Sequence, residues 1–193
     1  MSRAGRLWGG LALSWSVVLP ACHAVPRPPS SGLFLFEKGR YQFLYDAEGR
    51  LLRVVEDANG DGRAEAVLLY RPDGRLKAAE IDSDGDGSVD RWETFSESGA
   101  LERVAIARHR PAQADEWDDV DASGALVRRS FDEDGDGRVD RVEDLEGGLV
   151  VREQVDTDHD GTMDRRVLRG PRGEVIGVAV AREGRWETMP AKP

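Results

Sequence analysis

The 193-residue sequence contains a single cysteine, Cys22, and few aromatic residues, only 7% of the chain. One cysteine excludes an internal disulfide and any zinc site built from four cysteines. Apolar residues make up 39% and charged residues 33%, so only a thin hydrophobic core can form. Lys and Arg are outnumbered by Asp and Glu, 27 to 37, which gives a formal net charge of −10. Because nucleic-acid binding needs a basic face that displaces phosphate counterions, we expect no nucleic-acid partner.

Motifs of the common enzyme classes are missing as well. The sequence has no G-x-S-x-G, no H-E-x-x-H and no phosphate-binding glycine loop. Its three histidines, His23, His109 and His159, fall in three different segments. The many carboxylates include pairs suited to glycosidase chemistry, but their regular placement fits metal binding better. We therefore expect that the protein is not an enzyme.

Residues 1–21 have the pattern of a secretory signal peptide. Arg3 and Arg6 precede an uncharged, largely apolar run of 13 residues at 7–19. A bilayer-spanning helix takes about 20 apolar residues, so this run is too short to cross a membrane and is typical of a signal-peptide core.

The four residues that end this segment, Leu-Pro-Ala-Cys at 19–22, resemble the lipobox of bacterial lipoproteins. The resemblance implies cleavage before Cys22, lipidation of that cysteine and anchoring in a membrane. The expected location is the bacterial cell envelope, at the outer membrane or the cell surface. The alternative is ordinary secretion with cleavage after Ala24. Residues 22–32, rich in Pro and Ser, predict a flexible tether.

Residues 33–193 repeat with a period of about 25 residues. Turn glycines mark the repeats, each followed two residues later by Leu or Val; they are Gly49, Gly74, Gly99, Gly124, Gly148 and Gly173. Each half-repeat is about 7 residues long and often β-branched or aromatic, which is a strand length and too short for a stable helix. The sequence therefore predicts an all-β fold, an array of antiparallel β-hairpins that forms a twisted ribbon or an open solenoid.

One of these turns carries a family resemblance. The sequence YDAEGRL at 45–51 resembles the YD (RHS-type) repeat, whose hairpins build spiralling β-sheets. The resemblance implies hairpin geometry for the repeats. Glycine at the fourth turn position suits a type I turn followed by a left-handed residue, because glycine adopts a positive φ without a steric cost.

Four loops carry the pattern D-x-[DN]-x-D-G-x-x-[DE], beginning at Asp57, Asp82, Asp132 and Asp156. Oxygen-bearing side chains occupy loop positions 1, 3, 5 and 9. These sixteen predicted ligands are Asp57, Asn59, Asp61 and Glu65; Asp82, Asp84, Asp86 and Asp90; Asp132, Asp134, Asp136 and Asp140; and Asp156, Asp158, Asp160 and Asp164. Short Asp side chains on alternate residues of a tight loop converge on one point, and Ca²⁺ takes six to eight oxygens at about 2.3–2.6 Å. Mg²⁺ is disfavoured because it retains several waters.

The motif resembles the EF-hand calcium loop, and also the calcium loops of thrombospondin type 3 repeats and integrin-type propellers. An EF-hand needs Glu at position 12 and two flanking helices. Position 12 is Leu68, Glu93, Glu143 or Val167, and the repeat leaves no room for helices. We therefore expect calcium loops between strands, with the two glutamates in strands. The first site, with an amide ligand, and the last site, where His159 replaces a glycine, should be weaker than the other two.

One repeat lacks the motif. The period places its loop at 107–115, where Ala107, His109 and Pro111 stand in place of the three leading acids. The sequence leaves two explanations open, a changed shape or contact site and the simple loss of a metal site.

The acidity of the chain is concentrated in these loops. Loss of residues 1–21, which contain two arginines and no acid, changes the formal net charge from −10 to −12, and fifteen of the remaining acids are predicted ligands. Without metal, like charges crowd within each loop, so calcium binding and folding should be coupled. The sequence predicts a calcium-binding, membrane-anchored repeat lipoprotein with a structural or spacer role at the cell envelope. The alternative is a calcium-stiffened binding or adhesion module that recognises a protein or glycan partner.

Overall fold

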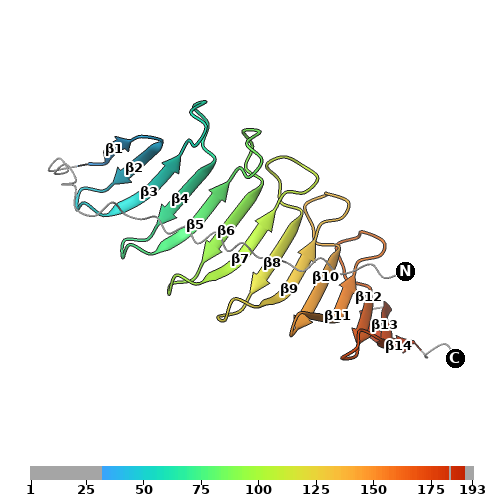
Figure 1. The fold of residues 1–193 in the computed structure, drawn as a ribbon. Coiled ribbons are helices and arrows are strands. Elements are labelled where there is room, and N and C mark those ends of the chain that lie inside the picture. Colours follow the sequence, from blue (N-terminus) through green and yellow to red (C-terminus); the bar gives the residue numbers. More distant parts are fainter. Residues whose placement is uncertain (1–31, 183, 190–193) are drawn as a thin grey trace.

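The computed structural model describes residues 32–182 and 184–189, which form one open antiparallel β-sheet (Figure 1). The signal peptide, 1–21, and residues 22–31 of the tether lie outside the described residues. Fourteen strands follow one another in chain order, each hydrogen-bonded to the next. They are β1 (Phe34–Lys38), β2 (Tyr41–Tyr45), β3 (Leu51–Glu56), β4 (Ala66–Tyr70), β5 (Leu76–Ile81), β6 (Arg91–Phe95), β7 (Leu101–Ile106), β8 (Glu116–Val120), β9 (Leu126–Phe131), β10 (Arg141–Glu146), β11 (Leu149–Val155), β12 (Arg165–Arg169), β13 (Val175–Arg182) and β14 (Arg185–Met189).

The predicted hairpin array is confirmed. The described residues contain no helix, and therefore none that could cross a bilayer. Glu93 and Glu143 lie in β6 and β10, as expected for strand residues. Strands β1 and β14 lie beyond the hairpins that the turn glycines close, and they form the two edges of the sheet.

Two kinds of connection alternate along the chain. Short turns follow the even-numbered strands from β2 to β12, and nine-residue loops follow the odd-numbered strands from β3 to β11. In Figure 1 the long loops project from the upper side of the sheet and the short turns from the lower side. All of the Asp-rich loops therefore lie along the same side of the sheet, at the ends of the strands rather than on either face.

Five of the six short turns have the predicted geometry; the sixth differs, because Gly147 and Gly148 alone connect β10 to β11 and both have a positive φ, 58° and 80°. The Gly49 amide donates to the Asp46 carbonyl at 3.0 Å, Gly49 has a φ of 79°, and the β2–β3 register shifts at Leu44/Tyr45. The equivalent glycines Gly74, Gly99, Gly124 and Gly173 have φ between 79° and 86°. A left-handed residue followed by a bulge closes each of these hairpins, which explains why glycine recurs there.

The sheet is a single layer, and the character of one face changes along it. A row of directly paired residues crosses this face in the order Phe43, Val54, Leu68, Ala79, Glu93, Val104, Asp118, Arg129, Glu143, Glu153, Val167 and Val178. Its N-terminal part is apolar, and Val54, Leu68, Ala79 and Ile81 form the hydrophobic core cluster. From β6 onward charged residues enter the row, and four charged residues follow one another from Asp118 in β8 to Glu153 in β11; Arg129 Nε lies 2.9 Å from Asp118 Oδ1.

The opposite face carries a ladder of cross-strand ion pairs in the same C-terminal region. Arg103, Asp119, Arg128, Asp144 and Arg152 are successive partners from β7 to β11. Arg128 Nε and Arg152 Nε each donate to the Asp144 carboxylate, at 2.8 and 2.6 Å. Opposite charges on paired positions contribute about 0.2–1 kcal/mol each, and the arginine stems cover apolar surface that a second layer would otherwise shield.

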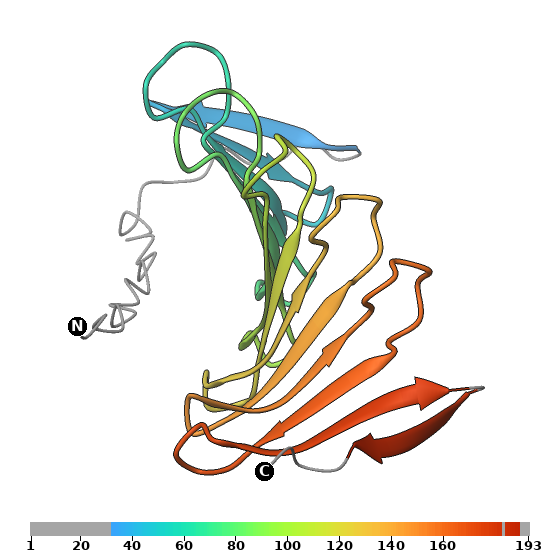
Figure 2. The same ribbon diagram turned by 90° about the vertical axis from the view of Figure 1, so that its right-hand side faces the viewer.

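The sheet is not flat. Figure 2 shows the strands rotating progressively, so that the ribbon coils and its two ends point in different directions. A sheet of more than about ten strands was expected to twist or coil, because each strand has a right-handed twist that accumulates along the sheet. The observed architecture is therefore the twisted-ribbon form of the predicted array.

Candidate metal loops

The nine-residue loops are held to the sheet by backbone hydrogen bonds at both of their ends. The amide at loop position 1 donates to the position-9 carbonyl of the preceding loop, as from Asp82 to Glu65 at 2.9 Å and from Asp156 to Asp140 at 2.7 Å. The position-9 amide donates back to the strand that precedes its own loop, as from Asp90 to the Ile81 carbonyl at 3.0 Å. Each loop is thus fixed at both ends and joined to its neighbour.

Inside each Asp-rich loop the position-1 carboxylate binds backbone amides. In loop 82–90, Asp82 Oδ1 accepts from the Gly85 amide at 2.8 Å and Oδ2 from the Gly87 amide at 2.7 Å. The two glycines have φ of 74° and 92°, and Asp82 is only 5% exposed. The loop motif already places glycine at position 6. The structure shows that the residue at position 4 also has a positive φ, because the amides at positions 4 and 6 both donate to the carboxylate at position 1.

Three carboxylates converge in each Asp-rich loop. Their ligand atoms lie within 4.8 Å of one another in the sets Asp57, Asp61 and Glu65; Asp82, Asp84 and Asp86; Asp132, Asp134 and Asp136; and Asp156, Asp158 and Asp164. Oxygens on opposite sides of a Ca²⁺ ion are about 5 Å apart when each lies 2.3–2.6 Å from it. The spacing and the hard oxygen donors therefore fit a divalent cation of this size.

Twelve of the sixteen predicted ligands are brought together in this way. Asn59 is bonded to Asp61 within its loop, the Asp61 amide donating to Asn59 Oδ1 at 2.8 Å. Asp90 and Asp160 do not belong to the three-residue set of their loop, and Asp140 lies instead in a set with Asp134 and His159.

The position-9 acids close the base of their loops. Asp90 accepts from the Ser83 amide at 3.2 Å and from its hydroxyl at 2.7 Å, and Asp164 accepts from Thr157 in the same manner, at 3.1 and 2.6 Å. Glu65 binds the Ala58 amide in the corresponding place. A small hydroxyl residue at position 2 therefore adds a bond to the loop base, a role that the sequence motif did not reveal.

Like charges meet inside these loops, as expected. The negative charge of Asp160 raises the pKa of Asp158, with a further contribution from burial. Burial also acts to raise the pKa of Asp156, but the amides of Gly161 and Asp160 outweigh it and leave that pKa below its ordinary value. Backbone dipoles thus stabilise the first acid of the loop, while the acids further along repel one another and favour a bound cation.

Loop 107–115 has the same ends but a different interior. The amides of Arg108 and His109 donate to Asp115 at 3.0 and 2.9 Å, and His109 Nδ1 lies 2.9 Å from Asp115 Oδ2. The Arg108 guanidinium binds Glu116, while Ala112 has a φ of 58° where the other loops have glycine. In the described part of the chain no cluster of three metal-ligating side chains includes this loop.

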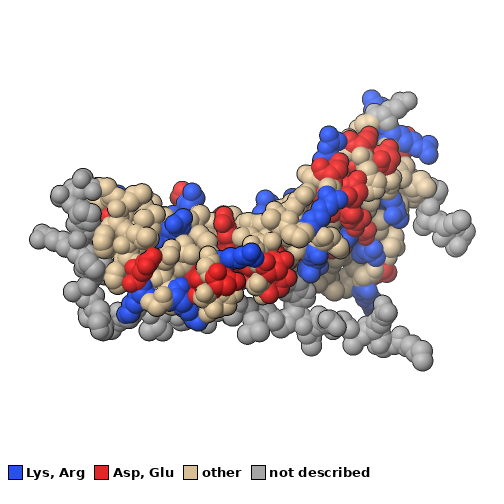
Figure 3. Space-filling model, turned by 90° about the horizontal axis from the view of Figure 1, so that it is seen from above, with Lys and Arg blue, Asp and Glu red and all other residues tan. Residues whose placement is uncertain are grey.

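Arginines link one loop to the next. Arg63 Nη1 donates to the Asp86 carbonyl at 3.2 Å, Arg138 Nη1 to the Asp160 carbonyl at 3.3 Å, and Arg110 Nη2 to the Asp134 carbonyl at 2.8 Å. Figure 3 views the molecule from above and shows basic side chains beside the acidic clusters. The loop motif did not predict these guanidinium contacts, although Arg at position 7 of two loops, Arg63 and Arg138, was an available signal.

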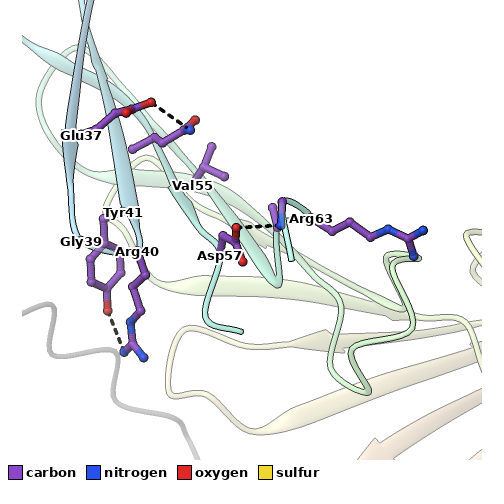
Figure 4. Close-up of a pocket in the computed structure, with 10 residues that line it drawn as sticks. Glu37, Gly39, Arg40, Tyr41, Val55, Asp57 and Arg63 are labelled. Carbon is purple, nitrogen blue, oxygen red and sulfur yellow. Dashed lines mark hydrogen bonds between the residues drawn. The ribbon is translucent and has the colours of Figure 1, made fainter. Parts of the chain in front are cut away.

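A pocket lies between the β1–β2 turn and the first Asp-rich loop (Figure 4). The Arg40 guanidinium donates to Tyr41 Oη at 3.0 Å, and Asp57 accepts from the Gly62 amide at 3.0 Å on the other side. The lining places no nucleophile beside a general base, so the pocket provides no catalytic arrangement and belongs to the surroundings of loop 57–65.

No family model matches the sequence, and no curated protein matches it either. Among solved structures, similarity is found to accessory secretory protein 1, 2 and 3 of Streptococcus pneumoniae, with a TM-score of 0.37, 10% identity and coverage of 66% of this chain and 23% of that one. A GtfA/B complex bound to UDP and GlcNAc has a TM-score of 0.32 and 14% identity, with coverage of 71% of this chain and 24% of that one. A porin-like protein from Bacteroides uniformis has a TM-score of 0.28 and 9% identity, with coverage of 81% of this chain and 73% of that one. The chain spans about a quarter of the first two, and no TM-score reaches 0.5, so these similarities establish neither family nor function.

Proposed function

We propose that this protein is a calcium-binding lipoprotein of the bacterial cell envelope, in which Ca²⁺ stiffens a repeat ribbon that serves as a structural element or spacer. The observation that carries the proposal is the alignment of four acidic clusters on one side of the sheet, in loops joined by backbone hydrogen bonds. A cation in each loop would act on neighbouring repeats through these bonds.

Electrostatics gives the physical basis of the stiffening. A single-layer sheet has no second layer to hold its strands in place, and each Asp-rich loop gathers like-charged carboxylates whose ligand atoms lie within 4.8 Å of one another. A divalent cation removes the repulsion between them and converts it into attraction between charges a few ångströms apart. Since Asp82 and Asp132 donate to the preceding loops through their amides, ordering one loop restrains the next.

Calcium suits these loops better than other biological cations. The clustered donors are carboxylate oxygens, which fit the variable coordination geometry of Ca²⁺, whereas Mg²⁺ requires a near-ideal octahedron and retains water. Thiolate ligands are absent, since the only cysteine of the sequence lies at position 22.

The anchoring part of the proposal rests on the lipobox-like sequence at 19–22. Lipidated Cys22 would hold the chain in the membrane, and residues 22–32 would separate the ribbon from the surface by up to about 40 Å if fully extended. Membrane sedimentation of the expressed chain tests this: a Cys22→Ser variant should move from the membrane fraction to the soluble one. A variant that remains membrane-bound would contradict the lipid anchor.

Isothermal titration calorimetry tests calcium binding directly. We expect the mature chain carrying Cys22→Ser to bind four Ca²⁺ ions, and an Asp82→Asn/Asp84→Asn variant to bind three. Asp73, in a short turn where it bonds Arg75, provides the matched control, and Asp73→Asn should leave four sites. Absence of calcium uptake at millimolar concentration, with Mg²⁺ as the comparison, would remove the proposed function.

The alternative, a binding or adhesion module, has one observation in its favour. Large apolar side chains are exposed toward the C-terminal end of the ribbon: Leu149, Leu168, Val175, Ile176, Trp186 and Met189. Such exposure is typical of interaction surfaces for a protein or glycan. Binding to isolated cell envelopes, compared in Ca²⁺ and in chelator, would distinguish the two functions: a structural spacer should be unaffected by Ile176→Ser, whereas an adhesion module should lose binding.

A further inference from the structure

The last two Asp-rich loops are joined by an imidazole. His159 occupies position 4 of loop 156–164, where the other three Asp-rich loops have glycine, and has a φ of 57°. Its Nδ1 lies 2.9 Å from Asp140 Oδ1 and 3.3 Å from Asp134 Oδ2, and both of these acids belong to the preceding loop. The sequence suggested only that His159 weakens its own loop; the structure directs the imidazole to the neighbouring one.

The three side chains form a preorganised set. Asp140 is 2% exposed, and the amides of Glu133 and Asp134 hold its Oδ2 at 2.6 and 3.2 Å, so Oδ1 is left facing the imidazole. The two loops are bonded by the Asp156 amide to the Asp140 carbonyl at 2.7 Å and by Arg138 to the Asp160 carbonyl. Asp134 and His159 are partly exposed, which leaves access from solvent.

The donor chemistry of this set differs from that of the other clusters. It supplies one imidazole nitrogen and two carboxylate oxygens, all within 4.8 Å of one another, whereas the other four sets contain only carboxylates. Ca²⁺ prefers oxygen alone, while Zn²⁺ and similar ions accept nitrogen and oxygen at about 2.0–2.2 Å. At that bond length, ligand atoms of a tetrahedral site are roughly 3.4 Å apart. The separations of 2.9 and 3.3 Å in the present structure need only a small opening to reach this value.

We propose that Asp134, Asp140 and His159 bind a borderline divalent transition-metal ion of the Zn²⁺ class between the two loops, with water completing the coordination. The ion replaces the proton on Nδ1 and binds the neutral imidazole. It competes with Ca²⁺ in loop 132–140, since Asp134 and Asp140 are shared; only this competition rests on the proposed calcium function. A bound ion would fasten loop 156–164 to loop 132–140 independently of calcium.

The probes are Zn²⁺ for calorimetry and Co²⁺ for visible absorption, applied to the mature chain carrying Cys22→Ser. We expect one high-affinity Zn²⁺ equivalent, a Co²⁺ spectrum with a nitrogen ligand, and weaker Zn²⁺ binding when Ca²⁺ is saturating. His159→Gly, which restores the residue found at this position in the other Asp-rich loops, should lower Zn²⁺ affinity at least tenfold. The same variant should retain the calcium stoichiometry of the parent.

Two outcomes would overturn the proposal. The first is no Zn²⁺ uptake, which would mean that His159 serves only as an imidazolium bridge between loops. The second is Zn²⁺ binding that is unchanged by His159→Gly, or that is lost in His109→Gln, which changes the histidine paired with Asp115. The Ca²⁺ titration of the same samples keeps the two proposals separate, because Zn²⁺ binding without calcium binding would refute the proposed function and leave this site intact.

Discussion

Loop 107–115 and loop 132–140 are adjacent, equally long and similarly attached, yet their interiors are opposite in charge. The Asp132 amide donates to the Asp115 carbonyl at 2.9 Å, and each loop ends in a buried aspartate. One loop contains Arg108, His109 and Arg110, whereas the other contains a cluster of three aspartates. In the first loop Arg108 binds Glu116 and Arg110 reaches the neighbouring loop, whereas the second loop gathers carboxylates close enough to hold a metal ion.

This difference separates two roles of the acids. The last acid of the loop has a structural role, because Asp115, which is in a loop without a metal cluster, binds the same amides at the loop base as Asp140 does. The leading acids are dispensable for the path of the sheet, since β7 and β8 pair normally without them. The converging carboxylates are therefore additions to a turn whose base forms without them, although Glu65 and Asp164 belong both to the base and to the acidic cluster of their loops.

The largest expected effect comes from removing calcium. Each site at a hundredfold excess of Ca²⁺ over its Kd contributes about 2.7 kcal/mol, and in a domain of this size 1 kcal/mol shifts Tm by roughly 2–4 °C. Chelation of four sites should lower Tm by roughly 20 °C or more, measured by circular dichroism. Hydrogen exchange should increase in the four Asp-rich loops and least in loop 107–115. An unchanged Tm would show that the loops are not coupled to folding.

Single Asp→Asn substitutions in the two loops should differ in how strongly their effect on stability depends on calcium. Asp132→Asn keeps one acceptor oxygen, removes the charge and loses the bond to either the Gly135 or the Gly137 amide, so it should cost about 1–3 kcal/mol in EDTA and, in Ca²⁺, a further 2–3 kcal/mol through loss of one calcium site. Asp115→Asn weakens the bonds to Arg108 and His109 and should cost about 1–3 kcal/mol with or without calcium. Denaturant unfolding in Ca²⁺ and in EDTA measures both. Calcium-dependent destabilisation by Asp115→Asn would contradict the division of roles.

Restoring the Asp-rich motif in loop 107–115 tests whether the motif residues are sufficient to create a calcium site there. A variant with Ala107→Asp, His109→Asp, Arg110→Gly, Pro111→Asp and Ala112→Gly should bind five Ca²⁺ ions instead of four. Without calcium it should be less stable than the parent by about 1 kcal/mol or more, because three like charges are brought together.

Calorimetry and thermal unfolding give the two readouts for this variant. Ala112→Gly alone is the control: it removes a left-handed alanine but adds no ligand, so the calcium stoichiometry should remain four. If the variant with five substitutions still binds four Ca²⁺ ions, the leading acids are not sufficient to form a calcium site.

Acidification of the calcium-free protein should give the smallest effect in loop 107–115, where a single aspartate closes the loop base. Burial acts to raise the pKa of Asp115, but the Arg108 and His109 amides and the His109 side chain outweigh it and lower that pKa. A lowered pKa stabilises the fold above the ordinary value of about 3.9, and this stability is lost as the pH falls through the folded-state pKa. Hydrogen exchange between pH 5 and 3 measures the loss, which Asp115→Asn should abolish.

The repeat could be predicted because it depends on local chemistry. Turn glycines such as Gly49 need only a positive φ, and the spacing of two 7-residue segments leaves room for strands alone. The acids of each loop converge because they are neighbours in sequence. Trp186 was expected in a strand and lies in β14, but the pairing of β14 with β13 did not follow from the repeat, since β14 lies beyond the last turn glycine of the series, Gly173.

Contacts between repeats were beyond prediction. Arg110 reaches the Asp134 carbonyl and His159 reaches Asp140, each across about 20 residues or more of sequence. Such contacts depend on which loops the meander places side by side and on the rotamers of long side chains. The motif therefore suggested a weak site at His159, whereas the fold directs the imidazole into the preceding loop.

The amino-acid sequence by itself determined the period, the strands, the turns and the grouping of carboxylates in each loop, because these depend on φ preference and on ligands a few residues apart. The tertiary structure decided which loops touch, which acids close a loop base and where His159 points. The reason is geometric, because antiparallel pairing brings loop residues 16–25 apart in sequence to hydrogen-bonding distance along one side of a twisted sheet.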